Sequence, residues 1–106
     1  MRKVYDKLVR DRIPDIIRQS GSECATETFS PDEFRRALRD KLVEEAREAA
    51  NASDDDLLTE LADVEEVLDA LLAAYGLTQE DVRRLQDGRR VERGGFTRRL
   101  RLLWTE

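Results

Sequence analysis

The chain has 106 residues, of which 41% are charged and 40% apolar, a balance that suits one folded domain spanning residues 1–106. It contains no histidine and a single cysteine, which excludes histidine-based catalysis, histidine-ligated zinc and an internal disulfide. The net charge of −5 is unevenly distributed along the chain. Residues 1–21 carry +3, residues 22–76 carry −11 and residues 77–106 carry +3. This acidic centre argues against binding to a nucleic acid duplex.

Aromatic residues make up only 6% of the chain, and alanine and leucine dominate the apolar set, so we expect an all-α fold. No apolar run approaches the roughly 18 residues that a membrane span needs, and the first residues lack a hydrophobic signal core. We therefore expect a soluble, cytoplasmic protein that does not bind membranes.

The first predicted element is a short helix over residues 14–20, because Pro14 suits a first helical turn and Gly21 suits a helix end. Residues 23–29 contain several β-forming side chains. They are predicted to be extended and are the candidate partner of residues 96–104 in a small β-hairpin.

Two long helices are predicted in the centre of the chain. Ser30 and Glu33 have the spacing of a capping box and predict a helix that runs to about Asn51. Ser53 or Asp54 then caps a second helix, which runs to about Tyr75. The short connection makes these helices antiparallel neighbours.

A further helix is predicted to start at residues 78–81 and to end near Val91. The paired Gly94 and Gly95 predict a turn after it.

Each central helix places a carboxylate inside its apolar stripe. At about 100° per residue, Glu45 falls between Phe34 and Leu38, and Glu48 lies at the edge of the same stripe. The other members of this stripe are Leu42, Ala46 and Ala49.

The second helix repeats the arrangement. Glu60 lies within an apolar face made by Leu57, Leu61, Val64, Val67, Leu68, Leu71 and Leu72, and Asp63 lies at the edge of that face. The two inward pairs of carboxylates are therefore expected to converge, and unpaired burial costs each several kcal/mol. Their charge is compensated either by arginine or lysine, such as Lys41 or Arg47, or by solvent in a groove, or by a divalent cation. Oxygen ligands without histidine or cysteine favour Mg²⁺, with Mn²⁺ as a substitute.

Three segments resemble the MazG-like all-α nucleotide pyrophosphohydrolases, a group that includes phosphoribosyl-ATP pyrophosphohydrolase. Residues 44–48 read Glu-Glu-Ala-Arg-Glu and residues 60–63 read Glu-Leu-Ala-Asp, which is similar to the family's E-E-x-x-E…E-x-x-D motif. Residues 7–14 are similar to the K-L-V-R-D-K-I-P opening of a short subgroup, and residues 92–96 are similar to its R-G-G-F ending. Together the three segments cover nearly the whole chain in the right order.

The resemblance implies a MazG-like helical bundle that cleaves a nucleoside triphosphate between its α- and β-phosphates. It implies that the family's metal-ligand positions fall on Glu45, Glu48, Glu60 and Asp63, with Glu44 and Glu45 as candidate catalytic residues. It also implies a homodimer or larger homo-oligomer, in which a second hairpin completes a four-helix bundle.

The basic ends of the chain supply candidate phosphate-binding residues, namely Lys7, Arg10 and Arg93. The alternative for each is surface solvation or an internal ion pair, which for Arg10 means Asp11 or Asp15. For the whole protein, two other functions remain open. One is hydrolysis of phosphoribosyl-ATP in histidine biosynthesis, and the other is a non-catalytic acidic helical module that binds a protein partner.

Overall fold

The computed structural model describes all 106 residues and consists of four helices without a β-strand, which confirms the predicted all-α class. The helices are α1 (Ile13–Gln19), α2 (Pro31–Asn51), α3 (Leu57–Ala74) and α4 (Gln79–Arg93). The chain divides into two compact units, Met1–Gly76 and Leu77–Glu106. None of the four helices combines the length and the apolar character that crossing a membrane would require.

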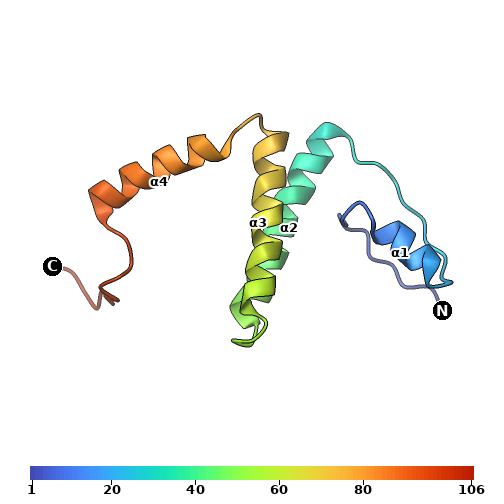
Figure 1. The fold of residues 1–106 in the computed structure, drawn as a ribbon, viewed down its shortest axis with the longest axis horizontal. Coiled ribbons are helices and arrows are strands. Elements are labelled where there is room, and N and C mark those ends of the chain that lie inside the picture. Colours follow the sequence, from blue (N-terminus) through green and yellow to red (C-terminus); the bar gives the residue numbers. More distant parts are fainter. The chain divides into compact units, whose positions relative to one another are not determined.

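In the first unit, α2 and α3 form an antiparallel hairpin whose helices lie side by side (Figure 1). Leu38 of α2 and Val67 of α3 are the buried apolar residues, and Glu45 of α2 is also buried, with 8% of its surface exposed. This confirms that Glu45 lies on the inward face of its helix. Ala46, which was also expected there, is exposed, so the inward stripe of α2 is narrower than the angular pattern suggested.

Local signals account for where the helices begin and end. The Ser30 hydroxyl accepts a hydrogen bond from the Glu33 amide, and the Glu33 carboxylate accepts one from the Ser30 amide, so the predicted capping box starts α2. The helix α1 ends where Gly21 adopts a φ of +93°, with the Ser22 amide donating to the Ile17 carbonyl.

The start of α3 differs from the prediction. Ser53 does not cap this helix, because its hydroxyl and carbonyl both accept from the amide of Asp56 in a turn that precedes it. The helix begins at Leu57, and its N-cap residue, Asp56, makes no capping hydrogen bond with its side chain. The polar connection is therefore longer by about one turn, which leaves the antiparallel hairpin intact.

In the second unit, Thr78 and Asp81 form a capping box at the start of α4. The helix continues two residues past Val91 and ends at Gly94, whose φ is +81°.

The predicted β-hairpin of residues 23–29 and 96–104 is wrong, since neither segment forms a strand. An isolated pair of strands is marginal in water unless its apolar side chains pack against a third element. The side chains of Phe96, Leu102 and Trp104 remain largely exposed, so the C-terminal segment has no such packing to stabilise a strand.

Candidate functional site

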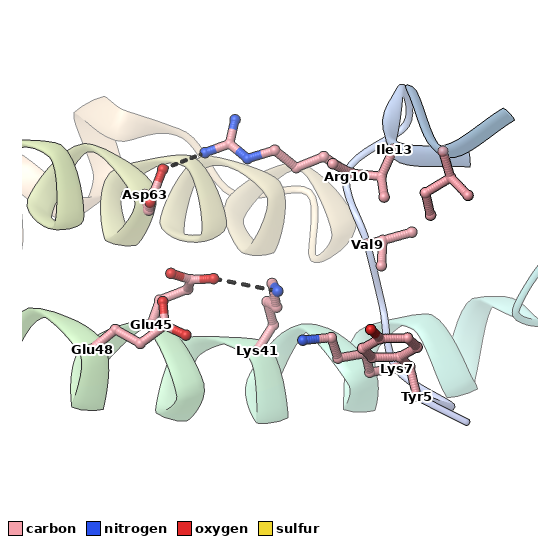
Figure 2. A pocket seen from close by; sticks show the side chains of 10 residues that line it. Tyr5, Lys7, Val9, Arg10, Ile13, Lys41, Glu45, Glu48 and Asp63 are labelled. Carbon is pink, nitrogen blue, oxygen red and sulfur yellow. Dashed lines mark hydrogen bonds and ion pairs between the residues drawn. The ribbon is translucent and has the colours of Figure 1, made fainter. Parts of the chain in front are cut away.

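Carboxylates from α2 and α3 meet on the inner side of the hairpin. Glu45, Glu60 and Asp63 each contribute an oxygen atom to a group in which these atoms all lie within 4.8 Å of one another. Glu48 lies one turn beyond Glu45 on α2, facing the same cavity (Figure 2). We call these four residues the acidic cluster. The helix register expected from the sequence thus brings Glu45, Glu60 and Asp63 together and places Glu48 at the same cavity as Glu45 and Asp63.

Two oxygen atoms of the acidic cluster are buried and have no hydrogen-bonding partner, namely Oε2 of Glu45 and Oε2 of Glu60. A buried carboxylate oxygen without a donor loses its hydration and gains nothing in exchange, which costs free energy. Such atoms are uncommon in folded proteins. Here they identify a place where a donor or a cation is required.

Two cationic side chains offset part of the negative charge. Lys41 Nζ lies 3.3 Å from Oε1 of Glu45, and Arg10 Nη2 donates to Oδ1 of Asp63 over 2.8 Å (Figure 2). Lys41 was expected as one possible compensator, whereas Arg10 was expected to pair locally or to bind phosphate. Two cationic side chains facing four carboxylates leave a net charge of −2. One divalent cation would neutralise it.

Glu44 is held apart from the acidic cluster. Its carboxylate accepts a hydrogen bond from Lys7 over 3.1 Å and lies 3.4 Å from Lys41, and it lines a second cavity between the N-terminal segment and α2. The hydrogen bond from Lys7 holds the pKa of Glu44 below its usual range, and Glu44 in turn raises the pKa of Lys7. Lys7 therefore has a carboxylate partner in the structure, while it also reaches the cavity of the acidic cluster.

The pKa of Glu48 is raised above its ordinary value of 4.5. The charge of Glu45 is the first cause, a hydrogen bond with the Glu45 side chain is the second, and desolvation and the charge of Glu60 add to the shift. Like charges on neighbouring carboxylates disfavour ionisation. A cation placed among these residues would relieve the repulsion.

This repulsion gives a prediction about stability. Because the folded state raises the pKa of Glu48, the protein loses stability as the pH rises from 4.5 through that raised pKa. In EDTA, Glu48→Gln should melt at a higher temperature than the wild type at a pH of about 7.5 and at nearly the same temperature near pH 4, where Glu48 is protonated. Thermal melting of both proteins across this pH range checks it. A variant that melts lower than the wild type at neutral pH would contradict the repulsion.

The third candidate phosphate-binding residue, Arg93, is the last residue of α4 and belongs to the second unit. Its role stays a prediction from the sequence.

Sequence reasoning missed the other end of the cavity, where Tyr5, Val9, Ile13 and Ile17 form an apolar lining. Apolar and charged residues alternate in this segment, and that pattern does not predict that these four apolar side chains share a cavity with the carboxylates.

Comparison with known proteins adds one relative. A protein from Mycolicibacterium smegmatis, described only as uncharacterized, is 46% identical over 54 residues, which make up 51% of this chain and 55% of that protein. The match thus spans about half the length of this relative. No family model matches the chain, and no solved structure matches it. None of the three comparisons names an activity, so the function proposed below rests on the residues of the site and on the sequence motifs.

Proposed function

We propose that this protein is a Mg²⁺-dependent nucleotide pyrophosphohydrolase that converts a nucleoside triphosphate and water into a nucleoside monophosphate and pyrophosphate. The observation that carries the proposal is the pair of buried, unpartnered oxygens of Glu45 and Glu60 within the acidic cluster. The motif resemblance of residues 44–48 and 60–63 supports the same assignment.

The donor set suits a hard divalent cation. All the ligands offered are carboxylate oxygens, and two of them lack any other partner, so the chemistry of the residues fits Mg²⁺ or Mn²⁺. Glu45, Glu48, Glu60 and Asp63 are the residues that would hold it. When bound, Mg²⁺ supplies positive charge that offsets the charge of the phosphates and orients a water for attack.

The protein's own side chains supply the proton acceptor and the donors that bind the phosphates. A carboxylate oxygen of Glu45 that the cation leaves free can accept a proton from the attacking water, whose oxygen forms a bond to the α-phosphorus as the bond to the bridging oxygen breaks. Pyrophosphate then leaves with that bridging oxygen. Arg10 and Lys7 reach the same cavity and can donate charge-assisted hydrogen bonds to phosphate oxygens. The hydrogen bond from Lys7 lowers the pKa of Glu44, which makes Glu44 a weaker base than an ordinary glutamate.

The bond that is cleaved provides the test. Purified protein with Mg²⁺ is incubated in ¹⁸O-labelled water with a panel of nucleoside triphosphates and with phosphoribosyl-ATP. Attack at the α-phosphorus places the label in the nucleoside monophosphate. Label in pyrophosphate alone would indicate attack at the β-phosphorus, release of orthophosphate would indicate attack at the γ-phosphorus, and lack of any turnover would overturn the enzyme assignment.

We also propose that the protein functions as a homo-oligomer. Three leucines at the start of α3, Leu57, Leu58 and Leu61, are exposed, and they lie on or beside the predicted apolar face of this helix. A second hairpin packed on this face would bury them. Light scattering should give a molar mass of a dimer or larger, and the double substitution Leu58→Gln and Leu61→Gln should reduce it. A monomeric wild type at micromolar concentration would contradict the proposal.

A further inference from the structure

The cavity lined by Glu45, Glu48 and Asp63 of the acidic cluster has a second end of different character. Its volume is about 410 Å³, within the range of small-molecule sites. Four apolar side chains line the end away from the carboxylates, and all of them come from the N-terminal segment and α1: Tyr5, Val9, Ile13 and Ile17. Val9, Ile13 and Ile17 are only half-buried, so each keeps surface for a ligand to cover.

Charged groups follow a definite order along this cavity. Figure 2 shows the carboxylates of Glu45, Glu48 and Asp63 at one end, with the guanidinium of Arg10 against Asp63. The ammonium groups of Lys41 and Lys7 come next, and Tyr5 and Val9 lie at the other end. A nucleotide bound to a divalent cation has the same order, with the cation first, then the phosphates, then the planar base. The sequence of negative, positive and apolar surfaces is therefore complementary to such a molecule.

Tyr5 is the side chain best placed to receive a planar group. The residue is 60% exposed, and two ammonium groups lie over its ring, that of Lys3 at 5.0 Å and that of Lys7 at 5.8 Å from the ring centre, so a stacking base would take the place of one of them. Cations over an aromatic ring favour this placement of the side chain. An aromatic face exposed beside phosphate-binding cations is the arrangement that stacks on nucleobases without reading their edges.

We infer that the apolar end of the cavity is the nucleobase subsite and that Tyr5 is the residue on which the base stacks. This inference rests on the proposed function, since it places the two ends of the same substrate. The phosphates then lie between the base and the acidic cluster, in reach of Arg10 and Lys7. Tyr5 determines affinity for the nucleoside part and does not act on the phosphorus.

The test compares Tyr5→Ala with Tyr5→Phe in steady-state hydrolysis. Loss of a stacking contact should raise KM for nucleoside triphosphates about ten-fold in Tyr5→Ala and leave kcat nearly unchanged, while Tyr5→Phe keeps the aromatic face and stays near the wild type. Inorganic tripolyphosphate, which has no base, is measured as a competitive inhibitor. Its inhibition constant should be the same for wild type and Tyr5→Ala.

Tyr75→Ala is the matched control. Tyr75 is also an exposed tyrosine flanked by cations, Arg35 and Arg39, but it does not line this cavity. Its replacement should leave KM unchanged. If the wild type hydrolyses nucleotides and Tyr5→Ala shows an unaltered KM, or weakens tripolyphosphate equally, the subsite is wrong while the proposed function stands. A wild type that hydrolyses none of the nucleotides overturns the function and the subsite together.

Discussion

Replacing Glu60 with glutamine should reduce nucleotide hydrolysis at least about 100-fold, a loss typical of removing one electrostatic group from an active site. Glu60 lies on the inward face of α3, and its Oε2 atom is buried without a donor. Glutamine keeps the shape of the side chain but removes the charge that a divalent cation needs. It also removes a repulsive charge from the metal-free cluster, so the variant should melt no lower than the wild type.

The matched control is Glu66→Gln, which makes the same change of charge on the exposed side of the same helix. Steady-state rates with Mg²⁺, together with melting curves in EDTA, compare the three proteins. Glu66→Gln should keep its activity. A fully active Glu60→Gln, or an equal loss in Glu66→Gln, would contradict a role for Glu60 in holding a cation.

Replacing Arg10 with glutamine should have opposite effects on the cation and on the nucleotide. Arg10 donates to Asp63, so it competes with a divalent cation for that carboxylate. Removing it should tighten Mn²⁺ binding about five-fold, which corresponds to about 1 kcal/mol for an ion pair this exposed. The same substitution removes a phosphate donor, so KM for the nucleotide should rise.

Arg18→Gln controls for the general loss of a positive charge. Arg18 lies in the same N-terminal segment and is similarly exposed, but its partner is Asp15 at 3.9 Å. Calorimetric titration with Mn²⁺ and steady-state kinetics measure both effects. Equal Mn²⁺ affinities in wild type and Arg10→Gln would show that Arg10 and the cation do not compete for Asp63.

The helices and the inward carboxylates could be predicted because they depend on local signals. Capping boxes at Ser30 and Thr78 and a left-handed Gly21 depend on residues within a turn of each helix end. The convergence of Glu45 with Glu60 required only helical periodicity and a short connection. Such features follow from sequence because few distant contacts can override them.

The contacts of the N-terminal segment could not be predicted in the same way. Arg10 and Asp63 are separated by 53 positions, and Lys7 and Glu44 by 37, so no periodicity links them. Nearby Asp11 and Asp15 offered equally plausible partners for Arg10. The choice among several carboxylates depends on how the irregular segment crosses the hairpin, which is a property of tertiary packing.

The proposed β-hairpin failed for a related reason. Residues 23–29 have β-forming side chains, but β-propensity reflects packing against neighbours more than a preference of the isolated chain. The structure supplies no such neighbour within a sheet.

Titration of the metal-free protein with Mn²⁺, followed by electron paramagnetic resonance of the free ion, tests most directly whether the acidic cluster binds a divalent cation. Wild-type protein should remove free Mn²⁺ from solution in a saturable manner, and excess Mg²⁺ should return it. Glu60→Gln should bind much more weakly, while Glu66→Gln should bind like the wild type. Saturable binding that is the same in all three proteins, or no binding in the wild type, would contradict binding of a divalent cation by the acidic cluster.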